Sequence, residues 1–150
     1  MRRSRIRRLW LVGIAIVIVA TFLGYRYGSQ STFEKERPVA VVKIRSTTRY
    51  GKILVSAGGF TLYTYKLDKK NHSECETFCL HVWPPFTVPG GVRPIGEGVF
   101  GLGTLLRSNG ERQVTYEGMP LYHYVYDQYP GRVLGDSGWW SVVKLPASTS

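Results

Sequence analysis

Residues 62–68 (LYTYKLD) and residues 121–127 (LYHYVYD) share one pattern, Leu-Tyr-x-Tyr-x-x-Asp, and this pattern decides the fold. The two stretches lie 59 positions apart, and two further pairs keep that spacing: Val55 with Val114, and Gly59 with Gly118. A fixed spacing of this kind indicates an internal repeat. We expect two half-domains related by approximate twofold symmetry, because neither half could bury its apolar face alone.

Beyond residue 38 the chain reads as short strands separated by Gly, Pro and Asn. Asn109 and Gly110 give the strongest hairpin signal, because both residue types tolerate the positive φ of a type I′ turn. Residues 84–103 hold six Gly and four Pro, so we expect a long ordered loop there. The expected strands are residues 39–44, 52–57, 60–67, 104–108, 111–117, 119–126 and 139–145. The sequence therefore predicts a mainly β fold, a small sandwich- or barrel-like domain made of two pseudo-repeats.

The positive charge of the chain is concentrated at its N-terminus. Lys and Arg total 20 against 10 Asp and Glu, a formal net charge of +10. Five arginines lie within residues 1–8, and from residue 28 onward the excess falls to 14 basic against 10 acidic residues. Nucleic-acid binding needs a basic patch on the folded domain itself. We therefore expect no nucleic-acid partner.

Residues 9–25 form an uncharged run of 17 mostly apolar residues. As a helix this run spans about 25 Å, near the lower limit for crossing a hydrocarbon core of about 30 Å. Trp10, Tyr25 and Tyr27 lie at its ends, where amphipathic rings favour the membrane interface. The arginines before the run predict a cytoplasmic N-terminus. A cleaved signal peptide is the alternative, although residues 18–20 are a poor cleavage site.

These features divide the chain into five expected parts. A basic cytoplasmic tail (1–8) leads into one transmembrane signal-anchor helix (9–27) in the cell (inner, or cytoplasmic) membrane. A polar linker (28–38) follows. The extracytoplasmic β domain (39–146) holds both repeats, and residues 147–150 form a short tail.

Cys75 and Cys79 stand in a Cys-x3-Cys spacing. On a helical turn their Cα atoms would lie about 6 Å apart, so a disulfide is the expected state in an oxidising compartment. Flanking His72 and His81 would complete a set of two thiolates and two imidazoles, which suits zinc or copper. A third hypothesis is redox activity, since short, exposed disulfides tend to be reducible. We expect no cofactor; zinc or copper belongs to the alternative.

The tyrosines of each repeat share one face of their strand, and the aspartate falls at the strand end. Such tyrosines suit a packed sheet, and a carboxylate at a strand end can accept backbone N–H groups and fix the following turn. We favour this structural interpretation. The alternative is a ligand site where the repeats converge. Its candidate residues are Tyr63, Tyr65, Asp68, Trp83, Tyr122, Tyr124 and Asp127.

These motifs, in this order, resemble the bacterial family called "secreted repeat of unknown function", predicted lipoproteins with a Y-x-[FWY]-x-x-D motif. The first copy is followed by SECETFCLHVWPPF, similar to a family stretch in which two Cys precede Trp-Pro-Pro. The second copy, with TYEGMPLYHYVYDQYPG and GDSGWW, is similar to the family's Gly-turn and Asp-x-x-Pro-Gly pattern. The resemblance covers residues 52–144. It implies an extracytoplasmic location and a repeat architecture, and no established activity. Many members carry an N-terminal lipoprotein Cys, where this chain has an Arg-flanked apolar run.

The chain contains no phosphate loop, nucleophile elbow or zinc-binding helix motif. We therefore expect a membrane-anchored, non-catalytic domain that binds an envelope protein or a small ligand. An envelope redox or metal-binding protein using the loop of Cys75 and Cys79 is the second hypothesis. An enzyme using Asp68 and Asp127 is the weakest, because it needs both carboxylates in one cleft.

Overall fold

A computed structural model of the chain describes residues 37–146. The expected cytoplasmic tail, the apolar run, all but the end of the linker, and residues 147–150 lie outside the described residues. Within residues 37–146, no helix has the length and apolar character needed to cross a membrane.

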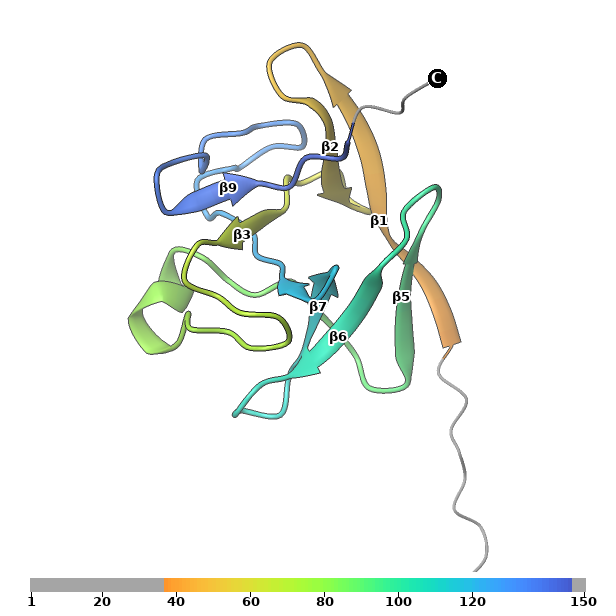
Figure 1. Cartoon of the computed structure of the whole chain (residues 1–150), viewed down its shortest axis with the longest axis vertical. Helices are drawn as coiled ribbons and strands as arrows, with labels where there is room; N and C mark the ends of the chain where they lie inside the picture. Colours follow the sequence, from red (N-terminus) through yellow and green to blue (C-terminus); the bar gives the residue numbers. More distant parts are fainter. Residues whose placement is uncertain (1–36, 147–150) are drawn as a thin grey trace, which may run out of the picture. The chain divides into compact units, whose positions relative to one another are not determined.

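The described residues form nine short strands and one 3-10 helix, so the predicted mainly β class is confirmed (Figure 1). In chain order these elements are β1 (Arg37–Thr47), β2 (Gly51–Ser56), β3 (Tyr63–Tyr65), η1 (Thr77–His81), β4 (Thr87–Val88), β5 (Val92–Gly96), β6 (Leu102–Leu106), β7 (Arg112–Tyr116), β8 (Met119–Pro120) and β9 (Trp140–Val142).

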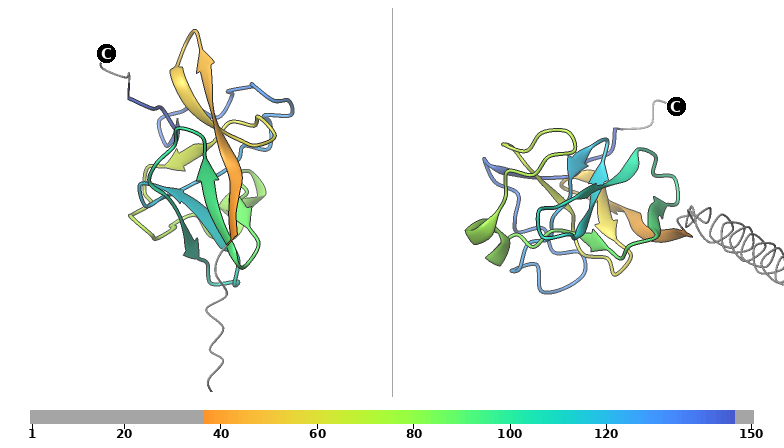
Figure 2. Two further views of the ribbon diagram at one scale, coloured as in Figure 1. Left: turned by 90° about the vertical axis from the view of Figure 1, so that its right-hand side faces the viewer. Right: turned by 90° about the horizontal axis from the view of Figure 1, so that it is seen from below.

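The strands form three small sheets. In the first, β1 lies between β2, to which it is antiparallel, and β5, to which it is parallel. Figure 2 shows β1 running beside β5 before it continues into the hairpin with β2. In the second, β7 lies between β4 and β6, and β8 pairs with the end of β7. The third pairs β3 with β9. These sheets are not closed into a barrel, so that part of the expected architecture is absent among residues 37–146.

The two predicted repeats are built alike. Each begins with an antiparallel hairpin, β1 with β2 or β6 with β7. In each repeat the second strand of the hairpin also bonds a segment from outside the hairpin on its other edge, through Leu54 N–H to Val143 O and Val114 N–H to Phe86 O. Glycines with positive φ recur at the turns: Gly51 with Gly110, and Gly59 with Gly118.

Two clusters of buried side chains fill the domain, and both draw on the two repeats. The aliphatic cluster contains Val42, Leu54, Leu62, Val88, Val92, Val99, Val114, Leu121 and Val143. The aromatic cluster contains Ile53, Val55, Tyr63, Cys75, Trp83, Tyr122, Trp140 and Val142. Equivalent residues such as Leu62 and Leu121 therefore pack in one core, and neither repeat has a closed core of its own.

The prediction of one long loop over residues 84–103 is wrong, because β4 and β5 lie within it. β5 alternates buried Val92 and Pro94 with exposed Arg93 and Ile95, and it pairs in parallel with β1. A proline is tolerated here because β5 is an edge strand, whose outer N–H groups have no strand to bond. The Gly and Pro content hid a short strand whose partner lies far away in the sequence.

The Asn109–Gly110 turn also differs from the predicted type I′ turn, since only Gly110 has a positive φ. Gly110 N–H donates to Arg107 O, and Arg107 N–H donates to Glu111 O. This is a three-residue loop closed by a left-handed glycine, the next most common hairpin connection. The Glu117–Gly118 turn has positive φ at both residues, which is the type I′ signature.

Two predicted strands are shorter than expected because their residues change partners along the chain. Residues 60–67 pair with β2 through Thr61, and then with Tyr122 and β9 through Tyr63. Residues 119–126 change their pairing partners in the same way after β8. Regular ladders therefore persist for only two or three residues in these segments.

Substituting Gly118→Ala tests the turn that the repeat pattern predicts. Gly118 has a φ of +84°, and an added Cβ would lie 3.3 Å from Lys70 Cγ. We expect urea denaturation to show a loss of about 1–2 kcal/mol in the free energy of unfolding, the usual cost of a left-handed residue with a Cβ. Gly90→Ala is the control, since no atom lies within 4 Å of its Cβ position and its φ is not left-handed. Equal losses in the two variants would contradict this assignment.

Candidate functional site

The two motif aspartates bond to tyrosines of the opposite repeat. The Tyr63 hydroxyl donates to Asp127 Oδ2 at 2.5 Å, and the Tyr122 hydroxyl donates to Asp68 Oδ2 at 2.8 Å. All four side chains are buried. Each hydrogen bond joins one half of the domain to the other, so the Tyr-x-Tyr-x-x-Asp pattern forms a reciprocal pair of cross-links.

The second oxygen of each aspartate holds the loop that follows it. Asp68 Oδ1 accepts Glu74 N–H at 2.8 Å, and Asp127 Oδ1 accepts Leu134 N–H at 2.9 Å. This is the turn-fixing role that the structural interpretation predicts. Both oxygens of each carboxylate therefore accept hydrogen bonds from within the domain.

The backbones of Tyr63 and Tyr122 are paired directly. Tyr63 N–H donates to Tyr122 O at 3.0 Å, and Tyr122 N–H donates to Tyr63 O at 2.9 Å. The same two rings meet tryptophans edge to face, Tyr63 with Trp83 at 5.3 Å and Tyr122 with Trp140 at 5.0 Å between centroids. Such edge contacts are a favoured aromatic geometry. The centre of the domain is thus symmetric in both its backbone and its side chains.

Four aromatic rings form a continuous stack across this centre. Their order is Tyr65, Trp140, Trp83 and Tyr124, with successive centroids 4.5, 3.9 and 4.3 Å apart. The two indoles are nearly parallel, at an interplanar angle of 4°. The outer tyrosines come from equivalent positions of the two repeats. The predicted site residues are therefore brought together, but as a packed core in which the indoles are buried.

Burial governs the ionisation of the polar groups. It raises the pKa of Asp68, against the opposing effects of the Glu74 and Tyr122 hydrogen bonds and the Arg107 charge. It also raises the pKa of Tyr63, further increased by the hydrogen bond to Asp127, and the pKa of Tyr122. Both tyrosine hydroxyls thus remain protonated at neutral pH and can donate to the carboxylates.

A buried arginine holds the loop of the first repeat. Arg107 is 4% exposed and donates through Nη1 to Ser73 Oγ at 3.1 Å and to Gln113 Oε1 at 2.5 Å. Its Nη2 donates to Cys75 O at 2.7 Å and lies 3.0 Å from Glu76 Oε1. Buried charges are retained where they are paired and hydrogen-bonded. Arg107 lies just beyond the end of β6. It thus ties the cysteine loop to β7.

The predicted disulfide between Cys75 and Cys79 is confirmed, with Cα atoms 5.6 Å apart. Its flanking histidines have other neighbours: His72 Nε2 lies 3.5 Å from Glu74 Oε1, and His81 Nδ1 lies 3.3 Å from Phe78 O. Within residues 37–146, no three His, Cys, Asp or Glu side chains are grouped to hold a metal ion. Zinc or copper binding would need the reduced pair, and it stays a prediction.

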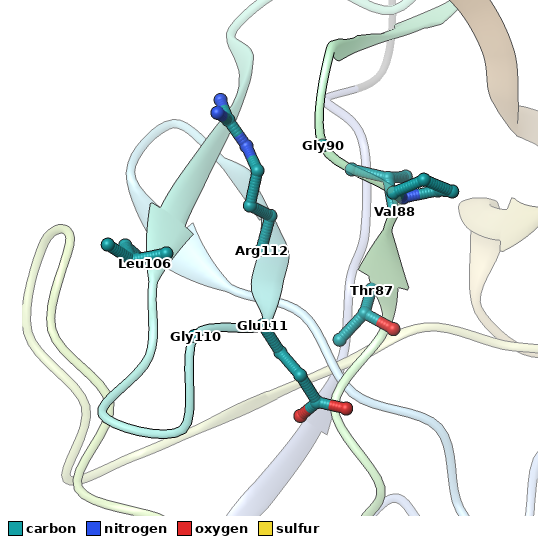
Figure 3. Close-up of a pocket in the computed structure, with 8 residues that line it drawn as sticks. Thr87, Val88, Gly90, Leu106, Gly110, Glu111 and Arg112 are labelled. Atoms are coloured by element: carbon teal, nitrogen blue, oxygen red, sulfur yellow. The ribbon is translucent and has the colours of Figure 1, made fainter.

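Open grooves on the surface of residues 37–146 include the following two. The first, the Phe100 groove, has a volume of about 400 Å³. Its lining includes Ile44, Lys52, Phe100, Tyr116, Glu117 and Leu145. The second, the Arg112 groove, has a volume of about 450 Å³ and includes Thr87, Val88, Gly90, Leu106, Glu111 and Arg112. Figure 3 shows the Arg112 side chain between Leu106 and the segment of Val88 and Gly90. Neither groove contains a residue of the predicted ligand site.

Sequence reasoning missed three residues that shape this region. No local sequence pattern marks Arg107 as a buried arginine. His123 is half-buried in edge contact with Phe60 and Phe86, and burial lowers its pKa. Phe100 lies in the glycine-rich stretch and is 87% exposed. Of these three residues, only Phe100 could have been noticed in the sequence, because it is an apolar residue with no strand pattern around it.

Comparison with known protein families gives a match. The family model described as "Secreted repeat of unknown function" matches residues 45–87 and 103–144, together more than half of the chain. The two segments coincide with the two repeats. No curated protein and no solved structure matches the chain.

Substituting Tyr63→Phe or Tyr122→Phe tests the reciprocal cross-links. Each change leaves a buried aspartate oxygen without its tyrosine donor, and we expect each to lower the free energy of unfolding by about 1–3 kcal/mol. Urea denaturation measures the loss. Tyr126→Phe is the matched control, because Tyr126 is exposed and we expect a change within about 0.5 kcal/mol. Values for Tyr63→Phe and Tyr122→Phe as small as the control would refute the cross-link role.

Proposed function

Since the chain belongs to the family described as "Secreted repeat of unknown function", we propose that it is a membrane-anchored extracytoplasmic binding domain. The family description supports the extracytoplasmic location, and the Arg-flanked apolar run supports the anchor. The occupant that we propose is an apolar segment of another envelope protein.

The observation that carries the binding proposal is the Phe100 groove. Phe100 is 87% exposed at its margin, and Ile44, Tyr116 and Leu145 give it an apolar lining. Lys52 and Glu117 add one charge of each sign to the same groove. A concave, mostly apolar surface with a few polar groups is the usual form of a binding site. An exposed aromatic ring beside it can serve as an anchor for a partner.

The structural role of the motif residues supports the same proposal. Asp68 and Asp127 were the candidate catalytic carboxylates, and both are engaged by a tyrosine hydroxyl and a backbone N–H. The aspartate that recurs in each repeat is used to join the halves of the domain. A rigid scaffold of this kind leaves recognition to its loops and grooves.

The intact mass of the chain extracted from membranes tests the anchor. An uncleaved anchor predicts the mass of all 150 residues and retention in the membrane after alkaline carbonate washing. A mature chain starting near residues 21–30, or one released by the wash, would contradict the anchor and favour the cleaved signal peptide.

Site-specific photo-crosslinking tests the groove in the full-length chain in its native membrane. A benzophenone amino acid replaces Phe100, and a matched probe replaces exposed Asn109. We expect one saturable adduct with an envelope protein at position 100 and none at position 109. Excess unlabelled chain should compete, whereas the Phe100→Ser chain should not; because Phe100 is exposed, that change should cost less than about 0.5 kcal/mol of stability. Equal competition by both chains would reject the groove as the binding surface.

A further inference from the structure

We propose that the Cys75–Cys79 disulfide is a thiol–disulfide exchange site for a dithiol partner at the cell envelope. The partner's thiolate attacks Cys79 Sγ, and Cys75, whose carbonyl oxygen accepts a hydrogen bond from Arg107, leaves as a thiolate. This function is separate from binding in the Phe100 groove and uses a different part of the surface. Four observations support it: unequal exposure of the two cysteines, support for the loop that does not depend on the disulfide, a strained residue in the ring, and a buried cation.

The two cysteines differ in access. Cys75 is 0% exposed and belongs to the aromatic cluster, whereas Cys79 is half-buried at the edge of that cluster. Cys79 lies in η1, which has no buried residue, and its neighbour Phe78 is 87% exposed. Thiol–disulfide exchange requires an incoming thiolate to reach one sulfur. Cys79 is therefore the sulfur open to attack.

The disulfide is not what holds the loop on the domain. Arg107 bonds Ser73 and Cys75 O, and it pairs with Glu76. Asp68 holds Glu74 N–H in the same loop. The disulfide closes only a short ring, which removes little chain entropy. The ring can open while the anchored residues stay in place.

The ring itself contains a strained residue. Thr77 lies between the two cysteines with a φ of +54°. A β-branched residue is a genuine outlier in the left-handed region, because its Cβ crowds the backbone. Opening the ring frees this residue to return to an ordinary conformation. The strain favours the reduced form.

Arg107 brings a positive charge to the backbone of Cys75, the residue that leaves as a thiolate. Its Nη2 atom lies 2.7 Å from Cys75 O, and the guanidinium is buried beside that residue. Burial of Cys75 in the aromatic cluster disfavours a thiolate, and a nearby cation offsets this effect. A better-stabilised thiolate is also a faster leaving group. Glu76 pairs with Arg107 and offsets part of its charge.

The exchange balances in two steps. In the first, the partner's thiolate forms a bond to Cys79 Sγ, the Cys75–Cys79 bond breaks, and its electron pair stays on Cys75 Sγ. In the second, the partner's other thiolate attacks the partner sulfur that is bonded to Cys79 in the mixed disulfide, and Cys79 leaves as a thiolate. The partner dithiol is oxidised to a disulfide, the Cys75–Cys79 pair is reduced by two electrons, and the two protons pass from the partner's thiols through water to the new thiolates.

Glutathione redox buffers test the site in the full-length chain held in detergent. Free thiols are alkylated and counted by mass across a series of reduced-to-oxidised glutathione ratios, with far-UV circular dichroism recorded on each sample. We expect the count to rise from zero to two within this series while the β signal is unchanged. A pair that stays oxidised at every ratio, or that is reduced only where the β signal is lost, would overturn the proposal.

Single-cysteine chains test the direction of attack. We expect Cys79 in the Cys75→Ser chain to form a mixed disulfide with oxidised glutathione at least roughly tenfold faster than Cys75 in the Cys79→Ser chain, because only the former is accessible. Equal rates, or a faster Cys75, would overturn Cys79 as the attacked sulfur.

Two variants that should shift the thiol–disulfide equilibrium in opposite directions test the chemistry of the loop. Glu76→Gln removes the carboxylate that offsets Arg107, and we expect the equilibrium to shift toward the dithiol by roughly two- to fivefold. Thr77→Asn places a residue that tolerates positive φ in the ring, and we expect a shift toward the disulfide by roughly fivefold. Glu74→Gln is the control, since Glu74 pairs with Lys69 and His72 instead of Arg107. A shift for Glu76→Gln no larger than for Glu74→Gln, or no shift for Thr77→Asn, would overturn the proposed mechanism.

Discussion

The hydrogen bonds from Tyr63 to Asp127 and from Tyr122 to Asp68 are the constraint on which the rest of the structure depends. A buried carboxylate is costly unless its oxygens are bonded, so each aspartate fixes both the tyrosine of the other repeat and the loop of its own. The tyrosines in turn pair through their backbones and pack against the indoles of Trp83 and Trp140. Folding one half correctly therefore requires the other half to be in place.

Much of this could be predicted from the sequence, because the signals were local or repeated. The recurrence of residues 62–68 at 121–127 predicted two alike halves, the Gly59 and Gly118 turns marked strand reversals, and the spacing of Cys75 and Cys79 predicted their disulfide. The structural interpretation of the aspartates predicted their turn contacts. It could not predict that each aspartate serves the opposite repeat, since nothing in one copy identifies its partner.

What could not be predicted depends on contacts between distant segments. β5 exists because β1 offers it an edge, and its own residues, including Pro94, read as a loop. The short ladders after β2 and β7 follow from partner changes that periodicity does not record. Arg107 is buried because the cysteine loop folds over it, some thirty residues away in the sequence. The Phe100 groove likewise combines side chains from both repeats and from β1.

The two halves share a scaffold and differ in their loops. The Tyr122 hydroxyl meets Ser73 Oγ in the first loop, whereas the Tyr63 hydroxyl meets the Gly135 N–H in the second. Only the first loop carries the disulfide and the bonds to Arg107. Since the shared residues are occupied in joining the halves, differences in chemistry between them must arise from these loops.

The reciprocity of the central contacts also bears on the origin of the chain. In a twofold dimer, residue i of one subunit contacts residue j of the other, and j contacts i. Tyrosine and aspartate of the two repeats obey this rule within a single polypeptide. A gene encoding one half alone would yield a protein that closes its core only by pairing with an identical copy. Duplication and fusion of such a gene would give the present chain, and it would free each loop to diverge without breaking the symmetry of the interface.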